Sequence, residues 1–404
     1  MQRQRTRRAG ARDGQAGLTL VELMITMIIA ALVATSTFIF FSGQQRIYDT
    51  QTKLLNTQQN VTAALELMAR YIRAEGSGLL GCVRPDSDAT GPDNGDPAPV
   101  GTGTGFNQAP GTGLRAFLSG TGTIRIPPLW IVNGAAGGPD SIAVAFGNGA
   151  FGNWSDTNLN ANVIDPTSAI TVPATPANIL NIFKDKEFVV LLDIQATPTV
   201  SANQDRGCSM FQVVGAPATN LPHPSTSKWN PATAAAAPGM VPFTYTAGGV
   251  TGIRNIGTLN WVRFAIQAGT ATVPPSLTME RLDMTGTAGW TGPQTLADGI
   301  EDLQVSYACD TNNDGTLTEN SPRDANDEWF LNSNAEVGNP NNCNRPSAIR
   351  ITLIARSLTP DTLLNGLTAG GSPNRKPAAE DGALGTADNY RHRILTTTIY
   401  PRNY

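Results

Sequence analysis

The feature that most constrains this chain is one long apolar run near its start. From Leu18 to Phe41 every residue is apolar or hydroxyl-bearing except Glu22. As an α-helix this run would be about 36 Å long, enough to cross a hydrocarbon core of about 30 Å. A secretory signal peptide has a shorter apolar core, of about 7–15 residues, and a small-residue cleavage site after it. We therefore expect a membrane-spanning helix.

The charges around this run predict its orientation. The net charge of the whole chain is −4, yet its first residues are basic. A positive flank favours a cytoplasmic N-terminus, which leaves the rest of the chain on the periplasmic side of an inner membrane. That remainder is acidic, and direct nucleic-acid binding would need a clustered basic surface. The basic residues of the flank are Arg3, Arg5, Arg7, Arg8 and Arg12.

Glu22 is unusual because a carboxylate deep in a membrane helix costs about 2.5–3.5 kcal/mol on insertion scales and usually has a functional partner. The residues Gly17-Leu18-Thr19-Leu20-Val21-Glu22 resemble the prepilin motif. The resemblance implies cleavage by a prepilin peptidase after Gly17 and N-methylation of Leu18, although the family usually has Phe at that position. It also implies that Glu22 pairs with the N-terminal amine of a neighbouring subunit. The alternative is an acid tolerated near the membrane interface.

The helical pattern continues beyond the apolar run. Residues 44–75 contain no Gly or Pro, and Gly76-Ser77-Gly78 follows them as a stop. Apolar residues recur on one face, which predicts an amphipathic half-helix that packs on a globular head; a coiled-coil seam is the alternative. The residues of this stripe are Ile47, Leu54, Val61, Leu65, Met68 and Ile72.

The rest of the chain favours strands joined by long loops. Residues 86–112 are rich in Gly, Pro, Thr and Asp and predict an exposed loop. No long helical pattern separates the later apolar runs, so we expect an antiparallel sheet and an α+β fold, with the long helix packed on a β-rich head. The predicted strands are 141–146, 187–194, 210–214, 259–266, 277–282, 300–307, 349–357 and 394–400. The predicted parts are a leader (1–17), a membrane helix (18–41), its amphipathic continuation (42–78) and a periplasmic head (79–404).

Several landmarks in the body resemble the PilW family of minor pilins. They are residues 73–78 leading to Gly81-Cys82, Cys208 followed by residues 210–213, and the segments 297–305, 349–357 and 397–403. The resemblance implies a non-enzymatic, single-pass subunit that helps prime a type IV pilus with other minor pilins and the major pilin. Its head would be periplasmic and later at the pilus tip, with twitching motility as an indirect output. Alternatives are a type II secretion pseudopilin and a tip adhesin.

Catalytic signatures are missing from the sequence. It contains no G-x-S-x-G, no H-E-x-x-H and no phosphate-binding loop, and its two histidines, His223 and His392, leave little general-base chemistry. The cysteines form no C-x-x-C pair, which argues against a zinc site. Outside the cytoplasm their even number suggests disulfides. Of the three pairings we favour Cys82–Cys208 and Cys309–Cys343, because the second encloses one polar loop between two strands; free thiols are the alternative.

The segment Asp310–Thr318 follows the calcium-loop pattern D-x-[DN]-x-[DN]-G, in which alternate oxygen ligands converge on a hard cation. The predicted ligands are Asp310, Asn312, Asp314, Thr316 and Thr318. The twelfth position, however, is Ser321 and not Glu, so Glu319 or Asp324 would have to replace it. The alternative is an Asn/Asp/Gly turn that needs no ion.

A calcium site of this kind would be weak, with a dissociation constant on the order of 10⁻⁴–10⁻³ M. We expect millimolar calcium to stabilise the head by at most about 1–1.5 kcal/mol, and Asp314→Ala to abolish the effect. Calorimetry with calcium and with chelator measures this shift. Identical melting curves in the two conditions would mean that the loop is a plain turn.

Overall fold

A computed structural model of the chain describes most of the helix and the strands of the head. The described residues are 19–77, 129–149, 154–158, 170–171, 182–193, 208–217, 220–224, 250–270, 272–282, 291–310, 312–320, 324, 326–331, 346–360, 375–386 and 388–401. The chain divides into two compact units, Met1–Leu55 and Asn56–Tyr404. The predicted loop at 86–112 lies outside the described residues.

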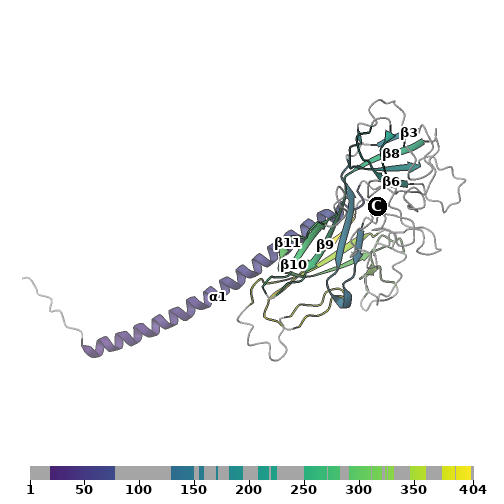
Figure 1. The fold of residues 1–404 in the computed structure, drawn as a ribbon. Coiled ribbons are helices and arrows are strands. Elements are labelled where there is room, and N and C mark those ends of the chain that lie inside the picture. The colour runs from purple at the N-terminus through teal and green to yellow at the C-terminus, as the bar shows by residue number, and fades with distance from the viewer. Residues whose placement is uncertain are drawn as a thin grey trace, which may run out of the picture. The chain divides into compact units, whose positions relative to one another are not determined.

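One helix, α1, runs from Leu20 to Arg73 (Figure 1). It ends where the sequence predicts, because Gly76 adopts a φ of +66°, a conformation that favours glycine. The amide of Gly76 donates to the carbonyl of Ala145 at 3.0 Å, and the amide of Gly147 donates to the carbonyl of Ser77 at 2.7 Å. The end of the helix is therefore tied directly to a strand of the head.

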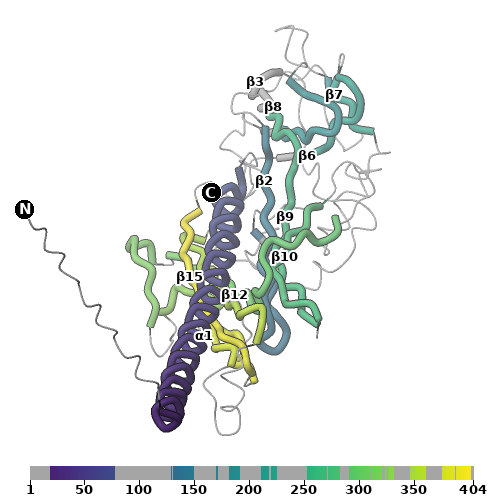
Figure 2. Tube along the Cα trace, turned by 90° about the vertical axis from the view of Figure 1, so that its left-hand side faces the viewer, coloured from purple at the N-terminus to yellow at the C-terminus, as the bar shows by residue number. Residues whose placement is uncertain are grey.

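Two antiparallel sheets form the part of the head that receives the helix. The first sheet has the order β1 (Leu129–Val132), β2 (Ser141–Gly147), β9 (Leu259–Gln267), β10 (Ser276–Arg281) and β11 (Gln294–Asp298). The second sheet has the order β13 (Trp329–Phe330), β12 (Ile300–Ala308), β14 (Ala348–Arg356) and β15 (His392–Ile399). Figure 2 shows β2, β9 and β10 running alongside one another, in agreement with their pairing.

A single residue links the first sheet to the second. Gly299 lies between β11 and β12 with a φ of +80°, and its amide donates to the carbonyl of Pro275 at 2.7 Å. A Cβ atom there would lie 2.7 Å from the carbonyl oxygen of Arg356. The chain can change sheets at this point because glycine both adopts the left-handed conformation and permits the close backbone approach.

A third sheet and a two-stranded ribbon lie between β2 and β9 in the sequence. The third sheet has the order β3 (Trp154–Asn158), β8 (Val250–Gly257), β5 (Phe188–Asp193) and β6 (Cys208–Gln212), and β4 (Ile170–Thr171) pairs with β7 (Asn220–Leu221). Every described strand pair in the chain is antiparallel.

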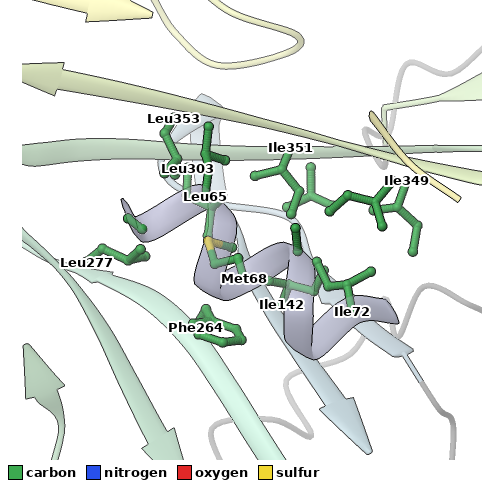
Figure 3. Packing of buried hydrophobic residues seen from close by; sticks show 14 of the residues in the cluster. Leu65, Met68, Ile72, Ile142, Phe264, Leu277, Leu303, Ile349, Ile351 and Leu353 are labelled. Atoms are coloured by element: carbon green, nitrogen blue, oxygen red, sulfur yellow. The ribbon is translucent and has the colours of Figure 1, made fainter. Parts of the chain in front are cut away.

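The second half of α1 forms the centre of the main core. Figure 3 shows Met68 and Ile72 of the helix among side chains of both sheets, such as Phe264 from β9 and Ile351 from β14. Each of these four side chains is fully buried. The buried helix residues are Thr57, Val61, Ala64, Leu65, Met68, Ala69 and Ile72. Their spacing of three and four residues places them on one face, which buries the apolar stripe between two sheets.

The expected α+β class with a long helix packed on an antiparallel head is confirmed. The predicted strand runs all coincide with strands, within two residues at each end. The predicted start of the apolar stripe at Ile47 was wrong. Ile47 is 52 % exposed and Leu54 is only partly buried, because packing against the sheets begins at Thr57. Strands that are very short, polar or interrupted by glycine were not predicted from the sequence, such as β8 with Gly252 and Gly257.

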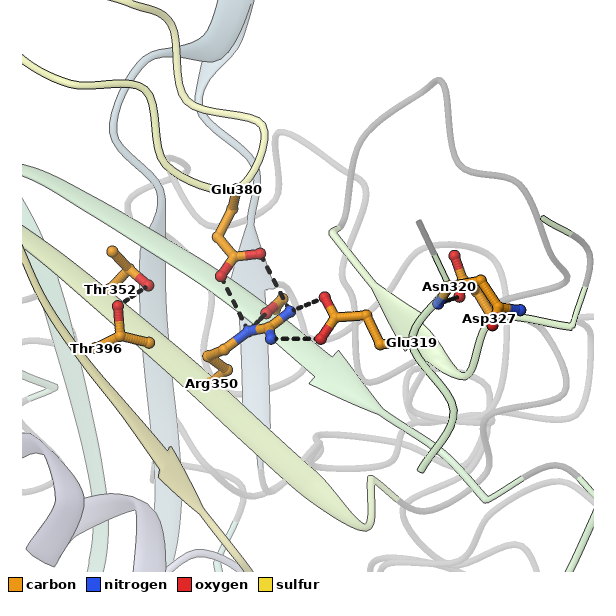
Figure 4. A network of polar contacts seen from close by, with 8 residues as sticks. Glu319, Asn320, Asp327, Arg350, Thr352, Glu380 and Thr396 are labelled. Carbon is orange, nitrogen blue, oxygen red and sulfur yellow. Dashed lines mark hydrogen bonds and ion pairs between the residues drawn. The ribbon is translucent and has the colours of Figure 1, made fainter. Parts of the chain in front are cut away.

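Arg350 of β14 joins the second sheet to two loops (Figure 4). Its guanidinium makes two parallel hydrogen bonds to Glu319, at 2.8 and 2.9 Å, and its Nε lies 2.9 Å from a carboxylate oxygen of Glu380. Nε also donates to Ser306 Oγ at 3.1 Å, and the guanidinium carbon lies 4.1 Å from the ring centroid of Trp329. Lysine could not reproduce this planar, forked arrangement.

Asp140 fastens the turn before β2 to β12. Its side chain is buried: Oδ1 accepts the amide of Gly134 at 2.9 Å and Oδ2 accepts the amide of Val305 at 2.8 Å. Its own amide donates to the carbonyl of Leu303 at 2.7 Å. A short loop at the edge of the first sheet is therefore hydrogen-bonded to the middle of the second.

Further carboxylates lie near Asp140. Asp302 accepts a hydrogen bond from Lys376 Nζ at 2.5 Å, and Asp381 accepts one from Asn133 Nδ2 at 3.1 Å. Burial raises the pKa of Asp140 to about 8, against the lowering effect of its two amide bonds, and the negative charges of Asp381 and Asp302 raise it further. The folded state therefore holds a proton on Asp140 at neutral pH.

The raised pKa predicts how stability depends on pH. The unfolded carboxyl loses its proton near its ordinary pKa of 3.8, whereas the folded one keeps it up to about pH 8. The contribution of Asp140 to the free energy of unfolding therefore falls as pH rises through this window, by at most about 1.4 kcal/mol per pH unit. We expect Asp140→Asn to flatten the pH dependence between pH 5 and 8, measured by urea unfolding of the chain in detergent.

Asp324→Asn is a matched control. Asp324 is exposed, and hydrogen bonds from Asn326 and Asn320 lower its pKa, so it stays ionised in both states between pH 5 and 8. The control should shift the stability by a constant amount without changing its slope. An unchanged slope in Asp140→Asn would show that Asp140 is already ionised in the folded protein.

Candidate functional site

The first turn of α1 contains Glu22, the residue that the sequence predicts to act in assembly. Thr19 precedes the helix as its N-cap: its Oγ1 accepts the amide of Glu22 at 3.3 Å, and its carbonyl accepts the amide of Leu23 at 3.1 Å. Glu22 stands at the third helical position. Thr-x-x-Glu is also the spacing of a capping box, so Glu22 has a structural role open to it besides charge pairing.

The helix beyond Glu22 exposes a continuous apolar surface. Leu20 and Phe38 are 76 % and 75 % exposed, and the large apolar residues between them are exposed as well. Within the described part of the chain, α1 is the one helix long and apolar enough to cross a membrane. Glu22 is the only ionisable residue from Leu20 to Gln45. Its carboxylate is therefore the one charge that a lipid environment would have to accommodate.

The hydroxyl residues of this segment need no partner from outside the helix. Thr26 donates to the carbonyl of Leu23 at 2.9 Å, and Thr35 donates to the carbonyl of Ala31 at 2.8 Å. Ser36 and Thr37 likewise donate to the carbonyls four residues earlier, at 2.9 and 2.8 Å. Such bonds satisfy a hydroxyl within the helix, so these residues are compatible with an apolar surrounding.

Several predicted site residues cannot be placed. Gly17, Leu18, Cys82 and Cys343 lie outside the described residues, so cleavage, methylation and both cysteine pairings stay predictions. Cys309 directly follows β12 and is disulfide-bonded. The side chains of the other three cysteines, including Cys208 in β6, are not among those described.

The predicted calcium loop is closed by its own amide groups. Asp310 accepts hydrogen bonds from the amides of Asp314 and Gly315, at 3.1 and 2.8 Å, and Asn312 Oδ1 accepts the amide of Asp314 at 2.8 Å. Asp314 in turn accepts the amide and the hydroxyl of Thr316, at 2.8 and 2.6 Å. These bonds, those from Thr316 above all, hold the pKa of Asp314 below its ordinary value.

Glu328, which the sequence analysis did not assign to this loop, anchors it from inside. Its buried carboxylate accepts the amide of Thr318 at 2.9 Å and lies 3.4 Å from the amide of Asn312. Its backbone amide donates to the carbonyl of Thr318 at 3.0 Å, and its carbonyl accepts the amide of Cys309 at 2.9 Å. No sequence signal could have found it, because its partners lie up to nineteen residues away and are backbone groups.

The described side chains do not form a metal cage. No group of three or more His, Cys, Asp or Glu residues suited to a metal occurs among them. In the loop, the carboxylate and amide oxygens of Asp310, Asn312 and Asp314 are already engaged by N–H and O–H donors. The geometry therefore fits a self-capped turn, and calcium binding stays a prediction.

Two family models match the chain. The model for the type IV pilus-assembly protein W family, PilW, matches residues 263–403, which run from within β9 to the end of the second sheet. The model for the prokaryotic N-terminal methylation motif matches residues 12–38, which include Gly17, Leu18 and Glu22. Of the landmarks that resembled the PilW family in the sequence, 297–305, 349–357 and 397–403 fall within the first match, whereas 73–82 and 208–213 lie outside it.

No curated protein sequence matches the chain. Among solved structures, the type IV-like pilin TTHA1219 from Thermus thermophilus is 15 % identical in sequence, with a TM-score of 0.20. The alignment covers 36 % of this chain and 68 % of that one. The chain is therefore similar to the N-terminal methylation motif at one end and to the PilW family over its C-terminal region.

Proposed function

We propose that this chain is a minor pilin, a non-enzymatic subunit that helps prime the assembly of a type IV pilus. In this proposal a prepilin peptidase cleaves after Gly17, Leu18 is N-methylated, and the helix holds the protein in the inner membrane until it enters the filament near its tip. The observation that carries the proposal is the position of Glu22, inside the matched methylation motif and in the first turn of an exposed apolar helix.

The proposed role of Glu22 follows from the cost of isolated charges in an apolar surrounding. The carboxylate and the amine of a neighbouring subunit's N-terminus would each be expensive there alone and would neutralise each other as a pair. Such a pair would also fix the axial register between subunits. Partners of the chain would then be the other minor pilins and the major pilin, all with similar apolar helices.

The surroundings of the histidines support a non-enzymatic role. Nε2 of His392 lies 3.0 Å from a carboxylate oxygen of Glu301 and 3.5 Å from one of Asp388, but the His392 side chain is only 5 % exposed. His223 Nδ1 lies 2.8 Å from the carbonyl oxygen of Leu221, which can only accept a hydrogen bond, and the His223 ring packs against Phe211. Both rings are thus held by local structure, and a substrate could not readily reach His392.

The PilW match over residues 263–403 favours a role in a type IV pilus over a role as a type II secretion pseudopilin. Both systems would share the processing signal and the membrane helix. Deletion of the gene, followed by counts of surface pili and an assay of protein secretion, separates the two. Loss of secretion with normal pili would overturn the pilus assignment.

The leader prediction can be tested by intact mass. We expect the protein extracted from membranes to begin at Leu18 and to carry one additional methyl group on its amino terminus. The physical reason is that the Gly17–Leu18 bond directly precedes the apolar helix, and the basic flank would hold it at the cytoplasmic face. An uncleaved Met1 terminus, or cleavage beyond Phe41, would contradict the pilin assignment.

Glu22→Gln separates charge pairing from helix capping. Gln at this position can still complete a capping box but carries no charge. If Glu22 neutralises a neighbour's amine, an uncompensated charge costs about 3–5 kcal/mol, and we expect pilus numbers to fall more than tenfold. Membrane insertion should stay normal. Electron microscopy of pili and membrane fractionation measure the two outcomes.

The control for this test is Thr19→Ala, which removes the observed cap and keeps the charge. Loss of an N-cap costs about 0.5–2 kcal/mol at a helix end, so it should affect assembly much less than Glu22→Gln. If instead Glu22→Gln assembles normally while Thr19→Ala does not, Glu22 acts only as a helix cap.

A further inference from the structure

Residues 148–258 are inserted between two neighbouring strands. β2 and β9 pair in continuous antiparallel register from Ser141↔Ala265 to Gly147↔Leu259. The chain therefore leaves the first sheet at Gly147 and returns to it at the residue directly opposite. In a simple β-hairpin these two positions would be joined by a tight turn.

The described strands of this insertion form their own sheets around their own core. The third sheet and the β4–β7 ribbon consist only of strands from within residues 148–258, grouped together in Figure 2. Their core shares no residue with the core that surrounds α1. Its buried residues are Ile170, Phe183, Val189, Leu191, Phe211, Val213, Leu221 and Ile253.

The two ends of the insertion are bound to each other. The amide of Gly149 donates to the carbonyl of Ile256 at 2.8 Å, and the amide of Thr258 donates to Asn148 Oδ1 at 2.7 Å. Gly257 has a φ of +69°, and a Cβ atom there would lie 2.5 Å from that same Oδ1. The first and last residues of the insertion therefore lie next to each other, at the point where the chain leaves the first sheet and returns to it.

We propose that residues 148–258 form a separately folding module and that priming of the pilus uses only the scaffold, meaning α1 with the first and second sheets. The functional part of this inference rests on the proposed function. Both family matches, residues 12–38 and 263–403, lie outside the module.

Separate folding is tested in the full chain by native-state hydrogen exchange. Phe211→Ala empties a buried position in the module, and Phe264→Ala empties one in the scaffold, so the two variants remove the same side chain. Phe211→Ala should lower the protection of amides in β5, β6 and β8 by about 100-fold or more and leave β12 and β14 unchanged. Phe264→Ala should lower the protection of β12 and β14.

An equal loss of protection in β12 and β14 in the Phe211→Ala protein would overturn the inference, because it would show that module and scaffold unfold together.

The functional part is tested by excision. Replacing residues 148–258 with Asn-Gly joins Gly147 to Leu259 through a two-residue turn that suits their pairing. The variant also carries Cys82→Ser, because the excision removes Cys208, the favoured partner of Cys82. We expect this variant to be cleaved, to keep protected amides in β12 and β14, and to restore pili to a strain that lacks the gene, within about twofold of wild type. A scaffold that does not fold, or a folded and cleaved variant that restores no pili, would contradict the inference.

If the strain without the gene already has normal pili, it is the proposed function that fails, while the exchange result on separate folding still stands.

Discussion

The packing of the second half of α1 between two sheets is the interaction on which the rest of the head depends. Met68 and Ile72 are fully buried and contact residues from the first and second sheets at once. Without the helix, the apolar side chains of both sheets that line this core would lose a packing partner that they share. The long helix is therefore both the proposed membrane segment and the central element of the head.

Buried polar groups fix the loops around this apolar core. Asp140 holds the turn before β2 against β12, and Arg350 holds two loops against β14. Glu328 does the same for the loop after β12. Each carries or can carry a charge that would be costly to bury alone, and each is compensated by several hydrogen bonds. Hydrophobic packing is not directional, so these hydrogen bonds determine where the loops lie against the strands.

Much of this fold could be predicted from periodicity and composition. The helix and the longer strands were predictable because a buried face imposes a repeat of three to four or of two residues, as in α1 and β14. The Gly17–Glu22 spacing identified the assembly motif that the family model matches. By contrast, β1 and β8 lack a clear pattern, and Asp140 accepts a hydrogen bond from Val305, which lies 165 residues away in sequence. Such pairings depend on tertiary structure, which local sequence does not encode.

The position of the helix between the sheets also determines how the protein responds to tension. A load along the axis of α1 would reach the head through Val61, Leu65, Met68 and Ile72, all packed side by side on the same stretch of helix. Such a load acts in shear, so these contacts must break together and cannot be peeled apart one by one. Resistance to a pull is governed by the rate of forced unfolding and not by equilibrium stability. The architecture therefore suits a subunit anchored by its N-terminal helix and exposed to mechanical force.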